Sequence, residues 1–192
     1  MIDFKKNLAF IKGEVDVSEA TKDAYSHDAS VFEIRPQVVV FPKDKEDISN
    51  LVKWVNDHKK EDPTLSITMR AAGTCMSGGS INDSIIVDTT KYMNQVISIR
   101  KTLPYTILPH FYGAKEVVCT GEAVVQPGLK YRNFEKQAQE AGLLLPCYTA
   151  SKSINALGGM VGNNSGGELT LRYGKTEDYV RELKVILKDG HE

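Results

Sequence analysis

The chain has 192 residues, of which 41% are hydrophobic and 26% charged, and its formal net charge is −1. This composition is typical of a globular protein with one domain or two small subdomains, and it gives no sign of a nucleic-acid or anionic-membrane surface. No apolar stretch reaches the roughly 18 residues of a membrane span, and the N-terminus lacks the apolar core of a signal peptide. We therefore expect a cytoplasmic protein.

Asp44 and the residues around it predict a β-α-β unit in the first half of the chain. Asp44 is a suitable N-cap for a helix with one apolar face, and the Val-rich run before it is typical of a buried strand. Asp16 and Glu19 have the spacing of a capping box. The predicted elements are helix 16–26, strand 37–41, helix 44–59, and strands 66–69, 85–88 and 96–99. Strand, helix and strand over 37–69 form the β-α-β unit.

The second half is predicted to contain a hairpin, further strands and a helix. The predicted elements are hairpin strands 103–111 and 116–119 around Tyr112-Gly113-Ala114, strand 122–126, helix 131–141, a loop over 150–167 and strand 183–187. Gly142 follows the helix at the position where glycine favours termination. The loop is rich in Ser, Asn and Gly and carries no charge between Lys152 and Glu168, so we expect it to wrap a polar ligand.

The last residues carry a hairpin signal. Asp189-Gly190 is typical of a type I′ turn, after which a strand should return along 183–187. Only His191 and Glu192 follow, and an unpaired strand edge is unfavourable in a folded protein. We therefore expect a truncated second subdomain, or a partner chain that supplies the missing strand.

The cysteines and histidines indicate no special chemistry. Cys75, Cys119 and Cys147 are widely spaced and odd in number, which argues against a disulfide framework and a CxxC motif. The four histidines are equally scattered, so we expect no metal site. His27 precedes an aspartate, but neighbours in sequence seldom meet productively, and a structural role is the expectation. We expect Cys75 to be a small packing residue.

Nine of the 15 glycines lie in two windows, within 70–80 and 158–174. Glycine reaches positive φ and lets the main chain approach a ligand, and successive N–H groups can form a nest for phosphate oxygens. From these residues alone, an ordinary connecting loop remains the alternative for the first window. Gly174-Lys175-Thr176 is not a P-loop, because Leu169 stands where its first glycine belongs, and no G-x-G-x-x-G follows a strand.

The two windows, roughly 80 residues apart, resemble the FAD-binding (PCMH-type) domain of the vanillyl-alcohol oxidase and p-cresol methylhydroxylase family. The stretches that carry the resemblance are His27-Asp28-Ala29-Ser30, Arg35-Pro36 with the following strand and Pro42, the loop around Gly73-Thr74, and Leu157-Gly158-Gly159-Met160 through Arg172–Asp178. The branch that they resemble is the FAD-linked oxidase of the D-lactate dehydrogenase and glycolate oxidase type. The resemblance covers nearly the whole chain except roughly Lys101–Gly121, and this segment looks like an insertion relative to the family pattern.

This resemblance implies an α+β, PCMH-type FAD-binding fold of two α/β subdomains with the cofactor between them. The first subdomain would span about 36–90 and hold the diphosphate loop. The second would span about 91–192 and be incomplete, and the C-terminal substrate domain of the family would be absent.

The resemblance also implies which residues bind FAD. The first loop would hold the diphosphate through Ala71, Ala72, Gly73, Thr74 and Cys75, with Ser77 and Gly78 nearby. The second would run toward the flavin through Ser153, Gly158, Gly159, Asn164, Gly166 and Gly174. Ala71 and Ala72 depart from the pattern, which often has glycine there. Thr74 lies in the loop where covalently flavinylated members often carry histidine, so we expect non-covalent FAD.

By the same resemblance, the protein would be a flavin-dependent oxidoreductase that oxidises a 2-hydroxy acid such as D-lactate or glycolate by hydride transfer to flavin N5. Its catalytic residues stay unknown, because in the family the substrate is bound largely by the C-terminal domain, and the chain alone is expected to be inactive. A protein electron acceptor or a quinone would be a further partner. The alternatives are a non-catalytic FAD-binding subunit that needs a separate substrate-domain chain, and a UDP-sugar enolpyruvyl reductase-like enzyme on the same fold.

Overall fold

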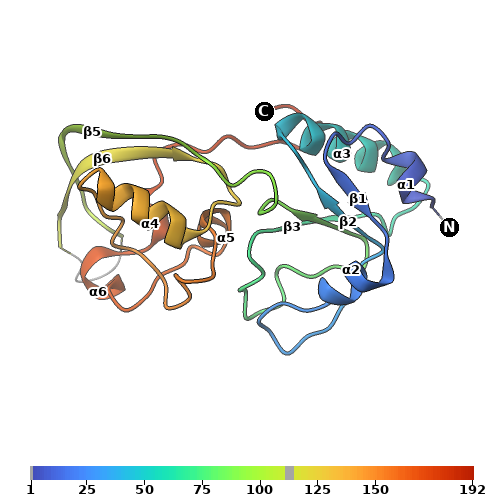
Figure 1. Ribbon diagram of the computed structural model, residues 1–192, viewed down its shortest axis with the longest axis horizontal. Coiled ribbons are helices and arrows are strands. Elements are labelled where there is room, and N and C mark those ends of the chain that lie inside the picture. The colour runs from blue at the N-terminus through green and yellow to red at the C-terminus, as the bar shows by residue number, and fades with distance from the viewer. Residues whose placement is uncertain (1, 111–114) are drawn as a thin grey trace. The chain divides into compact units, whose positions relative to one another are not determined.

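A computed structural model of the chain describes residues 2–110 and 115–192 (Figure 1). The chain divides into two compact units: unit 1 is Met1–Met93 with Lys184–Glu192, and unit 2 is Asn94–Leu183. The sequence analysis places 184–192 in the second subdomain, whereas the structure places these residues in unit 1. There, Ser49 Oγ donates a hydrogen bond of 2.5 Å to the carbonyl of Gly190.

Unit 1 is built on a four-stranded sheet in the order β1-β2-β4-β3 (Figure 1). The strands are β1 (Glu14–Asp16), β2 (Val38–Phe41), β3 (Ile67–Arg70) and β4 (Ile85–Asp88). β4 runs parallel to both β2 and β3, and β1 is antiparallel to β2. All residues of β2 and β4 are buried, which explains the continuous apolar runs Val38–Phe41 and Ile85–Val87.

Helix α3 (Lys45–His58) connects β2 to β3, so the predicted β-α-β unit is confirmed, with β4 between its two strands. Asp44 is the N-cap, as predicted, and its Oδ1 accepts from the amides of Glu46 at 3.0 Å and Asp47 at 3.1 Å. The Asp47 side chain then ties this helix end to the N-terminal segment by accepting from the amides of Lys12 and Gly13.

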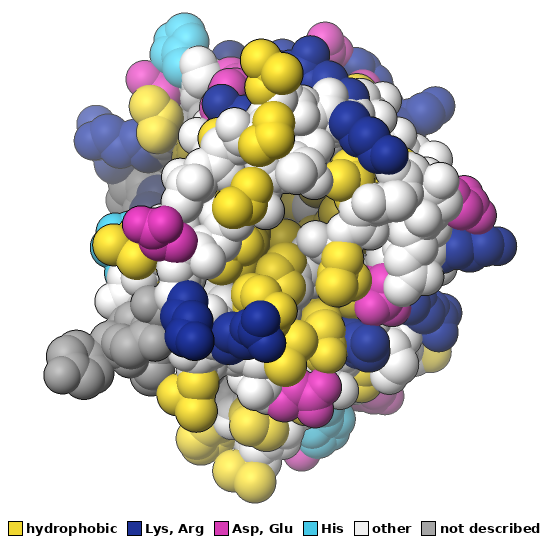
Figure 2. All heavy atoms as spheres, turned by 90° about the vertical axis from the view of Figure 1, so that its left-hand side faces the viewer, with side chains coloured by type: hydrophobic (Ala, Val, Ile, Leu, Met, Phe, Trp, Pro, Cys, Tyr) yellow, Lys and Arg dark blue, Asp and Glu magenta, His cyan; other side chains and the backbone are white. Residues whose placement is uncertain are grey.

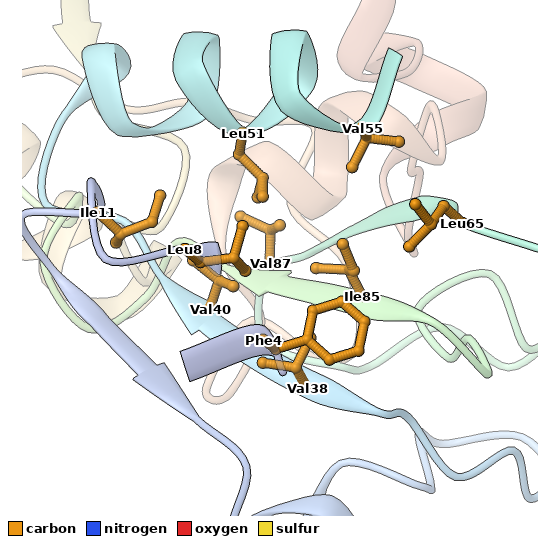
Figure 3. Close-up of a cluster of buried hydrophobic side chains, with 10 residues drawn as sticks. All are labelled: Phe4, Leu8, Ile11, Val38, Val40, Leu51, Val55, Leu65, Ile85 and Val87. Carbon is orange, nitrogen blue, oxygen red and sulfur yellow. The ribbon is translucent and has the colours of Figure 1, made fainter. Parts of the chain in front are cut away.

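The main core of unit 1 lies where α3 and the N-terminal segment cover the sheet (Figure 3). Side chains alternate along a strand, so one face of β2 and β4 supplies every second residue. The buried cluster consists of Phe4, Leu8, Ile11, Val38, Val40, Leu51, Val55, Leu65, Ile85 and Val87. Phe4 begins a short helix, α1 (Phe4–Asn7), which the sequence analysis did not predict. On the other face, Val39 and Ile86 pack with Phe41 and Tyr25.

The predicted capping box at Asp16 and Glu19 is wrong. Helix α2 spans Glu19–Ala24, and its N-cap is Ser18. Asp16 instead lies in β1, opposite Val39. Its carboxylate accepts from the Ser18 amide at 2.8 Å and the Thr21 hydroxyl at 2.7 Å. Strand pairing thus removes Asp16 from the helix, and its side chain stabilises the turn that precedes α2.

Unit 2 contains one long antiparallel hairpin, β5 (Val96–Ile107) and β6 (Val117–Val125). The strands predicted at 96–99 and 103–111 fall mainly in β5, and those predicted at 116–119 and 122–126 fall mainly in β6. Lys101–Ile107 of β5 and Val117–Gly121 of β6 therefore pair within the segment 101–121, with a register irregularity between Lys101 and Tyr105. β5 ends earlier than predicted, and the predicted turn Tyr112-Gly113-Ala114 lies outside the described residues.

Helix α4 (Tyr131–Glu140) ends as predicted at Gly142, which has φ +70°. The amides of Gly142 and Leu143 donate to the carbonyls of Gln139 and Ala138, both at 2.8 Å, in a Schellman motif. α4 packs beside α5 (Leu157–Gly162) and one face of the hairpin. The buried cluster of unit 2 consists of Leu129, Tyr131, Phe134, Ala138, Leu157 and Met160.

The expected loop over 150–167 therefore contains a helix. Leu157 and Met160, three residues apart, are both buried, and their burial stabilises α5 despite its glycines. Two further short helices follow, α6 (Thr170–Tyr173) and the 3-10 helix η1 (Thr176–Tyr179).

The predicted final strand and its turn type are also wrong. Residues 183–187 form no strand among the described residues. Gly190 has φ +78°, but Asp189 does not adopt a positive φ, which a type I′ turn requires. The Gly190 amide donates to Leu187 O, and the Leu187 amide to His191 O, both at 2.8 Å. These bonds close a three-residue turn with glycine at its left-handed position.

The hairpin leaves apolar side chains at the surface, because its core covers only one face. Ile97, Leu103, Val118 and Val124 are each more than half exposed. Figure 2 turns toward the viewer the side of Figure 1 on which β5 and β6 are drawn, and hydrophobic side chains gather there in a band. Within residues 2–110 and 115–192, no helix has the length and apolar character needed to cross a membrane.

Candidate functional site

The predicted site residues fall into two sets, one in each unit. The first set lies in the loop that follows β3 (residues 71–80), which we call the diphosphate loop after the ligand that the sequence analysis predicts for it. It leaves the sheet at the carboxyl end of β3, which pairs in parallel with β4. In α/β sheets, ligands bind outside this edge of the strands.

The backbone of the diphosphate loop combines two left-handed glycines with a run of main-chain amides that have no acceptor among the described residues. Gly73 has φ +66° and Gly78 has φ +78°, conformations that favour glycine. In the described part of the chain, the amides of Ala71, Ala72, Gly73 and Thr74 donate to no acceptor. Four consecutive half-buried residues thus offer main-chain N–H groups to a ligand, the property of a phosphate nest.

Of the remaining predicted residues of this loop, Cys75 and Ser77 carry polar side chains and Gly78 forms a turn. Cys75 is half-buried, and its Sγ lies 3.2 Å from Oγ of the exposed Ser77. At Gly78, an added Cβ would lie 3.0 Å from a ring carbon of Phe32. Glycine therefore both permits the positive φ of this turn and avoids a tight contact with the Phe32 ring.

Asp28 and Ala29 hold the loop from outside. The Ala29 amide donates to Gly73 O at 3.1 Å, and Asp28 Oδ2 accepts from Ser80 Oγ at 3.0 Å. Burial alone would raise the pKa of Asp28, but hydrogen bonds from Ser30 and Ser80 lower it below its usual range. The carboxylate is therefore a charged anchor for the loop. His27 is peripheral, with its Nε2 3.5 Å from Glu33 Oε1 at the surface.

Arg70 and Tyr25 lie directly beneath the loop, and the sequence analysis missed both. The Arg70 guanidinium carbon is 4.9 Å from the centre of the Tyr25 ring, and Nη1 donates to Ser80 O at 3.2 Å. The Tyr25 hydroxyl donates to Asp88 Oδ2 at 2.7 Å. Burial, followed by the charge of Asp88, raises the pKa of Tyr25, so the hydroxyl remains a neutral donor. The sequence signal that could have identified Arg70 is its positive charge directly before the run of small residues that begins at Ala71.

In unit 2, Gly158 and Asn164 shape the chain around α5. The Gly158 amide donates to Pro127 O at 2.8 Å, and an added Cβ would lie 2.7 Å from that oxygen, so close packing requires glycine. Asn164 adopts φ +44° just past α5, and its Oδ1 accepts from the Glu177 amide at 3.0 Å. Both residues are thus engaged within the chain. Gly159 is half-buried and Ser153 is exposed.

Gly166 and Gly174 also meet tight surroundings. A Cβ at Gly166 would collide with Thr170 Oγ1. Gly174 is buried with φ +79° and ψ −159°, a combination that is essentially restricted to glycine. A Cβ there would collide with Asp178 Oδ2 and lie 2.5 Å from Pro109 Cβ.

The three cysteines are free thiols, and among the described residues no three His, Cys, Asp or Glu side chains gather as metal ligands would. Burial raises the pKa of Cys147 to about 12 and also raises that of Cys119. These two side chains are thus protonated packing groups at neutral pH. The chemistry offered by the site is that of main-chain amides and one guanidinium, which suits an anionic cofactor.

Comparisons with known proteins agree with this arrangement. The family model described as FAD binding domain matches residues 36–192, most of the chain. The glycolate oxidase subunit GlcD of Bacillus subtilis (strain 168) is 29% identical over 98% of this chain and 36% of its own length. D-2-hydroxyglutarate dehydrogenase of Haemophilus influenzae (strain ATCC 51907 / DSM 11121 / KW20 / Rd) is 27% identical over 93% of this chain and 16% of its own length. The chain thus spans about a third or less of these relatives.

The fold also recurs in solved structures. The crystal structure of 6-hydroxy-D-nicotine oxidase from Arthrobacter nicotinovorans superposes with a TM-score of 0.69 at 21% identity, over 94% of this chain and 35% of that one. At this identity the likeness establishes the fold alone. With the family model matching most of the chain, the chain belongs to the FAD binding domain family, of the PCMH type, and its cofactor is FAD.

Proposed function

We propose that the diphosphate loop binds the FAD diphosphate, without a covalent bond, as part of an oxidoreductase acting on a 2-hydroxy acid. The observation that carries this proposal is the run of main-chain amides from Ala71 to Thr74 that have no acceptor within the described residues. The left-handed Gly73 bends this run, so that neighbouring N–H groups can converge on phosphate oxygens. Cys75, Ser77 and Gly78 complete the loop beside the phosphates.

The residues of unit 2 contribute to cofactor binding in two ways. Ser153 and Gly159 offer side-chain and main-chain polar groups to the remainder of the cofactor. Gly158, Asn164, Gly166 and Gly174 act by holding the chain in shape, because each contacts neighbouring groups of unit 2 closely. We infer non-covalent attachment because Thr74 lies in the loop where family members that bind FAD covalently often carry histidine.

The proposed reaction takes its class from the relatives. Glycolate oxidase and D-2-hydroxyglutarate dehydrogenase are named for 2-hydroxy acids, and this chain, whose residues 36–192 match the FAD binding domain model, aligns with a part of each. Bound FAD would supply the redox chemistry, a hydride transfer to N5, while the residues of this chain would bind and orient the cofactor. We assign no catalytic base to this chain and place substrate binding in a further C-terminal domain, with a protein or a quinone as the electron acceptor.

Cofactor binding is tested by titrating flavin-free protein with FAD in a calorimeter, for the wild type and Gly73→Ala. An added Cβ at Gly73 would lie 2.5 Å from Arg70 Nη2 in a backbone conformation that disfavours side chains. We expect the variant to bind FAD at least about tenfold more weakly. Gly162→Ala is the matched control, because nothing lies within 4 Å of an added Cβ there. Equal affinities for the wild type and Gly73→Ala would contradict the assignment of the loop.

The reaction class is tested by mixing the full-length flavoprotein anaerobically with glycolate, D-lactate and D-2-hydroxyglutarate. Loss of the flavin absorbance with one of these acids is the expected result. Reduction by NADPH, together with no response to any 2-hydroxy acid, would replace the proposal with a reductase function.

A further inference from the structure

Arg70 lies where a diphosphate would need a cation. It is the last residue of β3 and directly precedes the diphosphate loop. The guanidinium lies against Gly73: a Cβ built on this glycine would be 2.5 Å from Arg70 Nη2 and 2.7 Å from Cζ. A positive charge is thus within contact distance of the residue that bends the amide nest.

This charge is not neutralised by a carboxylate. Asp88 stands opposite Arg70 in the parallel pair β3 and β4, but within the described residues Arg70 has no carboxylate oxygen within 4.0 Å. Tyr25 donates to Asp88 Oδ2, and the amide and hydroxyl of Thr90 donate to Oδ1 at 2.5 and 2.6 Å. The obvious acidic partner is therefore engaged by neutral donors.

The donors of Arg70 are also largely unused. In the part of the chain that the structure describes, Nε and Nη2 donate to no acceptor, and Nη1 donates only to Ser80 O. The guanidinium is half-buried above the Tyr25 ring. A half-buried cation without a carboxylate partner is unfavourable, and a bound anion would supply both the missing charge and the missing acceptors. Arg35, by contrast, is paired with Glu19 and Asp23 in the same unit.

We propose that Arg70 binds the diphosphate of FAD through its guanidinium and sets the preference of the diphosphate loop for a doubly charged anion. This inference rests on the proposed function of the loop. Amides alone recognise phosphate geometry, whereas a planar guanidinium adds charge and paired donors for phosphate oxygens. The cation–π contact with Tyr25 holds the guanidinium near the loop before the ligand arrives.

The test compares FAD affinity by calorimetry for the wild type, Arg70→Gln, Arg70→Lys and Arg35→Gln, each at low and high salt. Arg70→Gln should weaken binding about 10- to 100-fold, the range for a lost charge-assisted hydrogen bond, and should reduce the salt dependence. Arg70→Lys should recover part of the affinity because it keeps the charge. Arg35→Gln removes the same charge elsewhere in unit 1 and should bind as the wild type does.

Thermal unfolding without FAD separates binding from structure. Removing an unpaired half-buried charge should leave the flavin-free midpoint of Arg70→Gln unchanged or raised. A clear fall in that midpoint, with an affinity loss that is the same at both salt concentrations, would assign Arg70 a structural role and overturn the inference. Equal FAD affinities for Arg70→Gln and Arg35→Gln would overturn it while leaving the loop's function intact. A wild type that binds no FAD would remove both proposals.

Discussion

Nδ1 of His110 lies 2.8 Å from Oδ1 of Asp178, although 68 residues separate them in sequence. The same carboxylate oxygen accepts from the His110 amide at 2.8 Å, and Oδ2 accepts from the Lys175 amide at 2.8 Å. The Asp178 side chain is 2% exposed, whereas the His110 ring is 83% exposed. One buried carboxylate therefore joins the segment that follows β5 to the 3-10 helix η1.

The stability of unit 2 should depend on the ionisation of Asp178. Burial would raise the pKa of Asp178, but hydrogen bonds from the amides of His110 and Lys175 lower it below its usual range. A carboxyl with a lowered folded-state pKa stabilises above its unfolded pKa of about 4, and this contribution is lost as pH falls through the folded-state value. Asp178→Asn should therefore cost about 1–3 kcal/mol at neutral pH and progressively less below about pH 4.

Urea unfolding of unit 2 across this pH range measures the effect of Asp178→Asn. Glu182→Gln is the control, because Glu182 is an exposed carboxyl in the same unit. A stability difference that stays constant down to acid pH would show that the ionisation of Asp178 is not its source.

Gly174→Ala and Gly162→Ala should have opposite effects on the stability of unit 2. Alanine at 174 would have to adopt a glycine-only conformation and collide with Asp178 Oδ2, so we expect a loss of at least about 2 kcal/mol. Alanine at 162 meets open space in α5 and should stabilise by up to about 1 kcal/mol. The free energies of unfolding from urea titrations check this pair. Equal changes for the two variants would refute the steric argument.

Asp47→Ala should strongly destabilise unit 1. The Asp47 side chain is fully buried and accepts from the amides of Lys12 at 2.8 Å, Gly13 at 3.0 Å and Lys43 at 2.8 Å. Alanine would leave three N–H groups without this acceptor, so we expect a cost of roughly 3 kcal/mol or more. Glu46→Gln on the same helical turn loses only a surface ion pair with Lys12 and should cost less than about 1 kcal/mol. Chemical denaturation compares the two variants, and similar losses would count against the role of Asp47.

Cys147 should resist alkylation in the native protein. Burial raises the pKa of this thiol to about 12, so the reactive thiolate is scarce at neutral pH, and the side chain is 1% exposed. Iodoacetamide labelling followed by peptide mass spectrometry should find Cys147 modified only after denaturant is added. Rapid labelling of the native protein would mean that this part of unit 2 opens frequently.

Elements with strong local signals could be predicted from the sequence. The N-cap at Asp44, the glycine stop at Gly142 and the buried strands of unit 1 depend on neighbouring residues, and the structure confirms them. The expectation for Asp16 was wrong because an interaction distant in sequence, the pairing of β1 with β2, outweighed a local capping preference. The predicted final strand is wrong for a related reason: 183–187 is rich in apolar residues, but a strand forms only where a partner strand supplies its hydrogen bonds.

The sequence by itself determined the family, through two windows of small residues whose identities limit what the main chain can do and bind. Only the tertiary structure revealed that Arg70 lies against Gly73 with no carboxylate partner in the described part of the chain, and that Asp178 contacts His110. Pairing and burial of charges depend on which distant segments come together. The packing of whole strands and helices decides those contacts, and residue spacing along the chain does not.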